Sequence, residues 1–147
     1  MKTLSAEDCD LFYATFRSLL DFANRRLKVN GLNDIIHADG LDPELVMEIS
    51  NKIWDDVSLI DDYLASEKIP DVQRDIVSGW KRCVKDTYIL ERHLKDGSIF
   101  IGKEDRVYQV HGIIDSWDVM LEMYPLPLVL RATLLPFKGM IITDGLV

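Results

Sequence analysis

Apolar residues in the first half of the chain recur every three or four positions, which is the spacing of a helix with one buried face. Ser5, followed three residues later by Asp8, is a helix-start signal ahead of this pattern, and Gly31 offers a left-handed cap after it. The pattern predicts a helix that ends near Leu27. Its apolar side carries Leu11, Phe12, Phe16, Leu19, Leu20, Phe22, Ala23 and Leu27, and its polar side carries Tyr13, Arg17, Asp21 and Asn24.

Two further helix starts follow, each marked by a proline next to an acid. The first is Asp42-Pro43-Glu44, which combines an N-cap acid with a first-turn proline and carboxylate. Apolar residues then recur at helical spacing to about Ser66, with a break expected near Asp55-Asp56. The second start is Pro70-Asp71, which opens a segment with Ile76 and Trp80 on its apolar side. The first half is therefore predicted to be helical.

After Lys85 the apolar spacing changes from helical to alternating, which is typical of strands with one buried face. Asp96-Gly97 lies between two alternating runs and is a strong hairpin-turn signal. Five strands are expected, with a short helix at Trp117–Met123 between the third and fourth. Their ranges are Tyr88–Leu94, Ser98–Ile101, Arg106–Ile114, Leu128–Leu135 and Met140–Thr143.

These elements predict a single α+β domain over residues 1–147, a length that fits one ordinary domain. Residues 1–85 are expected to form a mainly helical layer. This layer would pack on a curved antiparallel sheet of about five strands in residues 86–147, with the short helix near 116–123.

The charge balance excludes several classes of function. Lys and Arg number 17 and Asp and Glu number 25, so the net charge is -8, whereas a general nucleic-acid binder needs the opposite sign. No apolar run is long enough to span a membrane, and no secretory signal is apparent at the N-terminus. Two cysteines are too few for a disulfide framework or a zinc site. We therefore expect a reduced, cytoplasmic protein with no membrane contact and no cofactor.

The predicted hairpin register sorts the sheet into two faces. If Lys95 lies opposite Ser98 and Gly102 lies opposite Val107, then Leu90, Ile99, Ile101 and their apolar neighbours share the buried face. The other face is polar and half-solvated. The candidate ligand-binding residues on that polar face are Glu91, His93, Phe100, Gln109 and His111, with Lys95 and Ser98 beside them.

The two histidines of this face are too far apart to share a metal ion. Two strands and two residues of offset separate His93 from His111, which places their Cβ atoms roughly 12 Å apart. We therefore expect a groove for a small molecule or a peptide and no metal site. The alternative is a small enzyme that uses Glu91, His93 and His111 for acid-base work.

Two other surfaces remain open as partner sites. Residues 81–106 carry 7 basic and 5 acidic side chains, which leaves room for a regulator that contacts an RNA or ribosomal partner. The runs Leu128–Leu135 and Met140–Ile142 are too apolar for a bare sheet edge, so the 128–143 hairpin is a candidate homodimer surface.

Several segments of the second half carry a family resemblance: Trp80-Lys81-Arg82-Cys83-Val84, Arg92-His93-Leu94-Lys95, Ile99-Phe100, Leu126-Pro127-Leu128, residues 134–142 (LLPFKGMII) and Asp144-Gly145-Leu146. Together they resemble a family of uncharacterised bacterial proteins, over roughly residues 54–146. Some members append a cysteine-rich metal-binding motif of the SEC-C type, which is absent from this chain, so its zinc-linked role is not transferred. The resemblance implies a bacterial cytoplasmic protein and transfers no catalytic residue. The expected function is a non-catalytic interaction or ligand-binding module with an unknown protein or small-molecule partner.

Overall fold

The computed structural model describes residues 2–27 and 43–145, and within them it has an α+β fold. The chain divides into two compact units. The first, the β unit, joins residues 1–9 to residues 82–147, and the second, the helical unit, is residues 10–81. The α+β class, with helices mostly in the first half and strands in the second, is confirmed, and the single domain stays a prediction. None of the described helices combines the length and apolarity needed to cross a bilayer.

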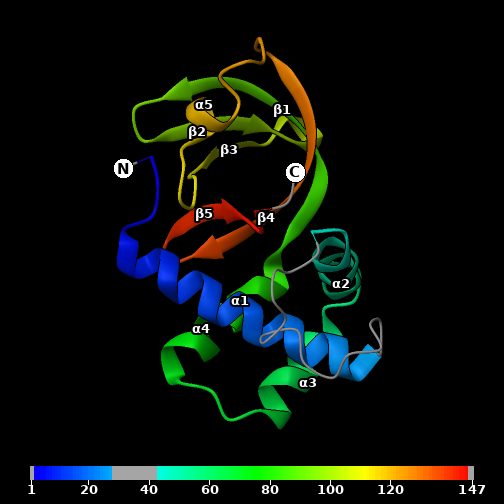
Figure 1. Ribbon diagram of the computed structural model, residues 1–147. Coiled ribbons are helices and arrows are strands. Elements are labelled where there is room, and N and C mark those ends of the chain that lie inside the picture. Colours follow the sequence, from blue (N-terminus) through cyan, green and yellow to red (C-terminus); the bar gives the residue numbers. More distant parts are fainter. Residues whose placement is uncertain (1, 28–42, 146–147) are drawn as a thin grey trace. The chain divides into compact units, whose positions relative to one another are not determined.

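The helices begin and end close to the predicted positions (Figure 1). α1 (Ala6–Leu27) is capped by Ser5, whose Oγ accepts a hydrogen bond from the Asp8 N–H at 3.1 Å. The chain breaks between α2 (Pro43–Asp55) and α3 (Ser58–Ser66) because the Asp56 carboxylate accepts both the N–H and the Oγ–H of Ser58. α4 (Asp71–Gly79) runs into a 3₁₀ turn, η1 (Trp80–Arg82). Gly31 and Asp42 lie outside the described residues.

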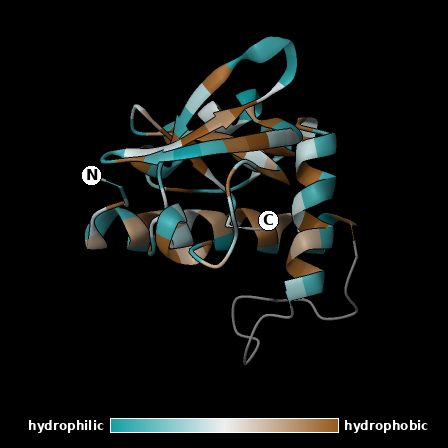
Figure 2. Ribbon diagram, turned by 90° about the horizontal axis from the view of Figure 1, so that it is seen from above, coloured by the Kyte–Doolittle hydropathy of each residue, from teal (hydrophilic) through white to brown (hydrophobic). Residues whose placement is uncertain are grey.

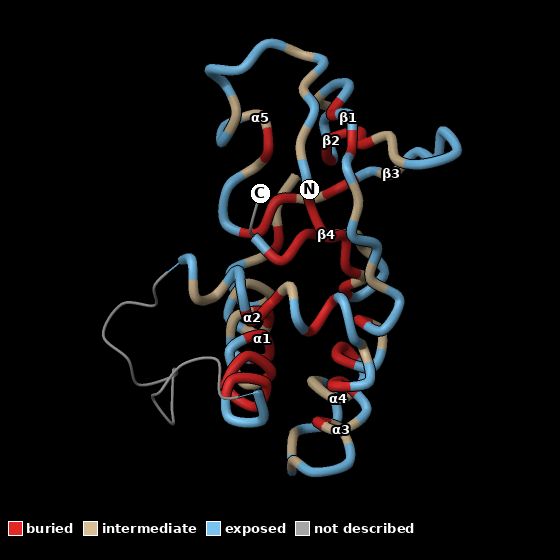
Figure 3. Tube along the Cα trace, turned by 90° about the vertical axis from the view of Figure 1, so that its right-hand side faces the viewer, coloured by how far each residue is buried: buried red, intermediate tan, exposed pale blue. Residues whose placement is uncertain are grey.

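Aromatic rings form the centre of the helical unit, and Figure 2 shows hydrophobic and hydrophilic residues alternating around its helices. Trp80 is fully buried, and its ring lies 5.9 Å from that of Phe12, 6.2 Å from that of Phe16 and 6.2 Å from that of Trp54. The buried stretch of α1 is continuous from Leu19 to Asn24, and the last turn after it is exposed (Figure 3). It includes Asp21 and Asn24, so their assignment to a solvated side of the helix is wrong.

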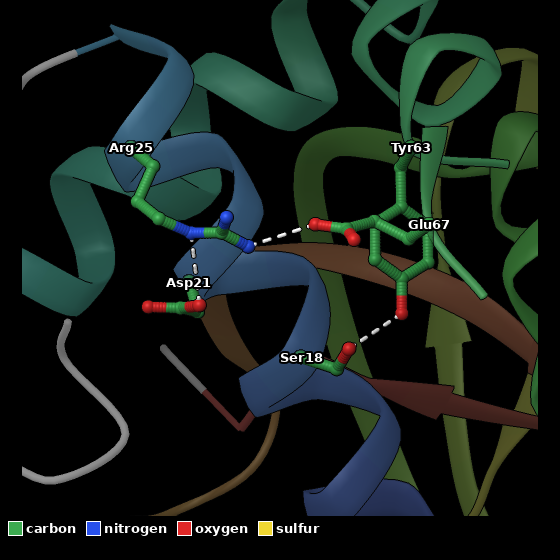
Figure 4. A network of polar contacts seen from close by, with 5 residues as sticks. All are labelled: Ser18, Asp21, Arg25, Tyr63 and Glu67. Atoms are coloured by element: carbon green, nitrogen blue, oxygen red, sulfur yellow. Dashed lines mark hydrogen bonds and ion pairs between the residues drawn. The ribbon is translucent and has the colours of Figure 1, made fainter. Parts of the chain in front are cut away.

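A polar network explains how Asp21 is accommodated (Figure 4). Arg25 donates to the Asp21 carboxylate at 3.1 Å and to the Glu67 carboxylate, at the end of α3, at 2.8 Å. Nearby, the hydroxyls of Ser18 and Tyr63 are 2.6 Å apart, and burial raises the pKa of the Tyr63 phenol. A buried charge is stable only with such partners, and the helical period alone does not reveal them.

The β unit contains one antiparallel sheet of five strands, as predicted, and the strand order, which the sequence did not indicate, is β3-β2-β1-β4-β5. The strands are β1 (Val84–Leu94), β2 (Gly97–Ile101), β3 (Val107–Val110), β4 (Leu128–Phe137) and β5 (Met140–Thr143). The sheet curls into a half-barrel, so its two outermost strands approach each other and the His111 N–H donates to the Ile141 carbonyl at 2.8 Å. The 3₁₀ turn η2 (Lys103–Asp105) joins β2 to β3, and α5 (Trp117–Met120) follows β3.

The inner face of the half-barrel holds the core of this unit. Phe100 is fully buried, and its ring lies 5.2 Å from that of Trp117 in α5. Tyr88 packs so closely on Gly102 that a Cβ there would lie 2.9 Å from its ring, so glycine is required. The buried members of this core are Tyr88, Leu90, Phe100, Val110, Trp117, Ala132 and Leu134.

The predicted hairpin turn, Asp96-Gly97, is placed one residue too late. Leu94 lies opposite Gly97, so the turn is Lys95-Asp96 and Gly97 belongs to β2. Gly97 marks a close approach to β3 and does not form the turn: a Cβ there would come within 3.0 Å of Gln109 Cγ and the Val110 carbonyl. An irregularity in β1 between Leu90 and Arg92 adds an unmatched residue. The shifted turn moves the pairing of β1 with β2 by two residues, from Lys95 opposite Ser98 to His93 opposite Ser98, which leaves the faces unchanged. The faces are exchanged by the extra residue in β1 and by a one-residue slip between β2 and β3, where Ile101 lies opposite Val107. Phe100 therefore points inward, while Ile99 and Ile101 lie on the outer face.

Candidate functional site

The five residues predicted to share a polar face do not share one. Phe100 is fully buried on the inner face, where it lies opposite Leu90 and Tyr108. Gln109 lies opposite Ile99 on the outer face and is exposed. Glu91 lies in the irregularity of β1, exposed and 3.9 Å from the Arg92 guanidinium. These placements correct the predicted grouping, which assumed a pairing of β2 with β3 that was one residue out and did not include the irregularity in β1.

His93 is brought into contact with Ser98, which lies directly opposite it, at 2.7 Å between Nδ1 and Oγ. An imidazole hydrogen-bonded to a serine hydroxyl is an arrangement that can activate a nucleophile. Ser98 is only 3% exposed, however, so a substrate would not reach its Oγ in this conformation. The pair therefore serves first as a satisfied cross-strand contact.

His111 lies just past β3, and its backbone helps to hold the two outer strands together through Ile141. Its Nδ1 is buried and has no hydrogen-bond partner among the described residues. Within residues 2–27 and 43–145, no three His, Cys, Asp or Glu side chains gather in a group that could hold a metal ion.

The curling of the sheet creates a cavity that the sequence analysis missed. Its volume is about 150 Å³, and it lies in the β unit, where residues of β1, β3, β4 and β5 line it. Val84 faces Leu134 and Pro136 faces Ile141 in the register, so these four residues share the inner face. The complete lining is Arg82, Val84, Tyr108, Leu134, Leu135, Pro136 and Ile141.

Arg82 is the single charged residue among the described residues that line this cavity. It has no ion-pair partner in the described part of the chain, whereas its neighbour Lys81 binds Asp61 at 2.8 Å. The remaining lining is apolar apart from the phenol of Tyr108. The cavity thus combines a hydrophobic body with one uncompensated positive charge, which favours an anion with an apolar group.

The cavity wall is held in place by Tyr88. Its hydroxyl donates to the Val84 carbonyl at 2.7 Å, and its ring meets that of Tyr108 edge to face at 6.0 Å. Burial, together with the nearby Tyr108, raises the pKa of the Tyr88 phenol, so it stays a neutral donor at physiological pH. Arg82 was visible in the sequence as part of a basic cluster, but nothing local indicated that Tyr108, Leu134 and Ile141 would converge beside it.

The 128–143 hairpin does not present the bare apolar edge from which a dimer surface was predicted. Leu134, Leu135, Phe137 and Ile142 are all buried within one copy. These four residues are therefore no dimer surface, whereas Val129, near the start of β4, is 65% exposed, and dimerisation through the 128–143 hairpin stays a prediction.

Comparison with known proteins adds no assignment: no family model, no curated protein and no solved structure matches this chain. The resemblance of the second half to a family of uncharacterised bacterial proteins therefore stays a prediction.

Proposed function

We propose that this protein is a non-catalytic ligand-binding module whose site is the cavity beside Arg82. Its ligand is a small organic anion with a compact apolar body. The observation that carries this proposal is the combination of an apolar cavity of about 150 Å³ with one cation that has no ion-pair partner among the described residues.

The size of the cavity limits the apolar part of the ligand. A cavity of about 150 Å³ lined by aliphatic and aromatic side chains holds one benzene-sized molecule. Drug-sized ligands need roughly 300 Å³ or more. The apolar body is therefore a single ring or a short branched chain.

The charge at the cavity selects the polar part of the ligand. A guanidinium binds a carboxylate through two parallel hydrogen bonds, so Arg82 suits a carboxylate better than a hydroxyl or an amide. The nearest acid along the inner face of β1, Asp86, accepts backbone N–H groups of Thr87 at 2.8 Å and Lys103 at 3.3 Å. Those contacts direct its carboxylate toward the chain. The ligand class is an aromatic or branched aliphatic carboxylate.

Titration with benzoate tests the proposal against its neutral analogue benzamide. We expect benzoate to shift the NMR signals of Tyr108 and Ile141. A charge-assisted hydrogen bond is worth about 1.5 kcal/mol or more, so benzamide should bind about tenfold more weakly. Arg82→Gln should reduce benzoate affinity by a similar factor. The matched control is Arg106→Gln, whose side chain is 69% exposed and lies outside the cavity lining. Equal binding of both compounds, or no effect of Arg82→Gln, would reject the proposal.

A second candidate function, a small hydrolytic enzyme, is favoured by the His93–Ser98 contact alone. A fluorophosphonate probe tests it, because an activated serine attacks phosphorus through Oγ and releases fluoride. Labelling that Ser98→Ala and His93→Gln both abolish would support an enzyme over a binding module. An unlabelled protein would remove this candidate.

Our proposal places the module in the cytoplasm, as its cysteine content suggests. Among the described residues neither cysteine forms a disulfide, and the Cys9 thiol donates to the Ile113 carbonyl at 3.2 Å. Fractionation of the host cell tests the location: recovery in an oxidising compartment would contradict it.

A further inference from the structure

The outer face of the sheet carries a row of exposed apolar side chains across four strands. Val107 lies opposite Ile101, Ile101 opposite Ile89, and Ile89 opposite Val129, so the four form one continuous row. Val107, Ile89 and Val129 are 62%, 42% and 65% exposed. We call these four residues the outer band. Solvated sheet faces are ordinarily polar, so a contiguous apolar row marks a contact surface.

Cations flank the outer band on both sides. Arg131, opposite Thr87, lies one row beyond Val129, and Arg92, opposite Ile99, lies on the other side of the band. Arg131 has no ion-pair partner within the described residues, and Arg92 has only the loose contact with Glu91. A partner of the outer band should therefore combine apolar side chains with acids.

One segment of this chain has that composition. Residues 114–124, which we call the apolar loop, contain α5 and carry acids at Asp115, Asp118 and Glu122. Five large apolar side chains of the apolar loop are exposed: Ile114 at 65%, Val119 at 57%, Met120 at 46%, Met123 at 85% and Tyr124 at 56%. Methionine is an adaptable contact residue, which suits a protruding surface.

The apolar loop is anchored, so its exposed side chains are presented in a fixed arrangement. Trp117 is buried against Phe100, and Asp118 is ion-paired to Lys2. Asp115 and Glu122 are exposed and have no ion-pair partner in the described residues. These two acids are thus available to cations of another molecule. A pre-arranged surface loses less conformational entropy on binding.

We propose that two copies of this chain form a two-fold dimer in which the apolar loop of each copy covers the outer band of the other. If the outer bands of the two copies met each other, Arg131 and Arg92 of one copy would face the same cations of the other. If the two apolar loops met, the acids of one loop would face the acids of the other. Contact of loop with band pairs apolar with apolar and acid with base. Tyr124 and Val129 are five residues apart, at most about 18 Å of chain, so one two-fold axis can serve both contacts.

The available area fits a stable dimer. Together, the five exposed loop residues and Val107, Ile89 and Val129 expose as much surface as nearly five fully exposed side chains. At ~150–200 Å² for each, this is on the order of 800 Å² per copy, the size of a standard protein interface. Neither surface includes the residues that line the cavity beside Arg82, so this proposal is independent of the ligand.

Sedimentation velocity of the full chain tests the dimer. We expect the wild type to dimerise in the micromolar range, and Met123→Glu and Val129→Glu each to raise the dissociation constant at least tenfold. Both side chains are well exposed, so each variant should keep its fold, which circular dichroism will check. The matched control is Val72→Glu, which alters a 48% exposed valine of the helical unit and should leave the dimer unchanged. A wild type that is monomeric at every accessible concentration overturns the proposal and leaves the surfaces to a different partner.

Two mixing experiments identify which surfaces meet. Met123→Glu keeps an intact outer band, and Val129→Glu keeps an intact apolar loop. A mixed dimer of the two variants can therefore form one unaltered contact of loop with band, so an equimolar mixture should dimerise more tightly than either variant alone. Glu122→Lys and Arg131→Glu should each weaken the dimer, and the double variant should recover part of the loss. A dimer that ignores these changes, or a mixture no tighter than its components, shows a different interface and overturns the proposal.

Discussion

The helical unit and the β unit differ in how far apart along the chain the residues lie that determine their local structure. In the helical unit the break between α2 and α3 is local: Asp56 accepts hydrogen bonds from Ser58, two residues along the chain. In the β unit the decisive glycine, Gly97, is required by Gln109 and Val110, about a dozen residues along the chain. The local break was predicted correctly from the sequence, whereas Gly97, which is needed for a contact with a distant strand, was assigned to a turn. The predictions below test this difference, from the largest expected effect to the smallest.

The largest effect should come from Phe100 in β2. Replacing this fully buried ring by alanine removes its contact with Trp117 and leaves a cavity, which should cost about 3–5 kcal/mol of unfolding free energy. Ile101→Ala, one residue along on the outer face, should cost about 1 kcal/mol, since its side chain is only partly buried. Urea unfolding of both variants measures the difference. The register predicted from the sequence buried Ile101 and exposed Phe100. A larger loss of stability in Ile101→Ala than in Phe100→Ala would therefore support that register.

A smaller loss is expected from Gly97→Ala. The added Cβ meets Gln109 Cγ and the Val110 carbonyl at 3.0 Å, and the residue's φ of +157° is one that side chains rarely adopt. We expect a loss of about 1–3 kcal/mol, as for other strained or overpacked positions. Gly139→Ala is the control: its φ is also positive, at +79°, but no atom lies within 4 Å of the new Cβ. Equal losses in thermal unfolding would show that the backbone angle, and not the approach of β3, makes glycine necessary at position 97.

The local Asp56–Ser58 contact between α2 and α3 should contribute less. Asp56→Ala removes the acceptor of the Ser58 N–H and Oγ–H, and such hydrogen bonds are worth about 1 kcal/mol. Asp75→Ala removes an exposed acid within α4 and should change stability by less than about 0.5 kcal/mol. Chemical denaturation compares the two variants. Indistinguishable midpoints would mean that the break at Asp56 depends on tertiary packing.

The smallest effect concerns pH. The hydrogen bond from Lys2, with a further one from Ser116, lowers the pKa of Asp118 from 3.8 to about 2. A lowered pKa stabilises the fold above the ordinary value, and this contribution is lost as the pH falls from 3.8 toward 2. Both side chains are about one-third exposed, so we expect only a few tenths of a kcal/mol. NMR titration should show the carboxyl midpoint of Asp118 rising in Lys2→Met, and an unchanged midpoint would contradict the pairing.

The candidate site was less predictable than the fold because its residues are brought together by curvature. The sequence indicated the strands that carry Val84, Leu134 and Ile141, but no local pattern states how far a sheet curls. The predicted polar face relied on two register assumptions, one for each hairpin. The pairing of β2 with β3 differs from the assumed one by one residue, and β1 has an extra residue near Glu91, so Phe100 lies in the interior and Gln109 on the opposite side.

The sequence by itself determined the α+β class, the helices with the cap at Ser5, and the existence of five strands, because helix and strand periods and capping groups act over a few residues. The tertiary structure alone decided which face of β2 is buried, how Asp21 is compensated, and where Arg82 meets an apolar cavity. The physical reason is that strand register and sheet curvature depend on side chains far apart along the chain. A shift of one residue reverses every side chain of a strand while leaving its alternating pattern unchanged.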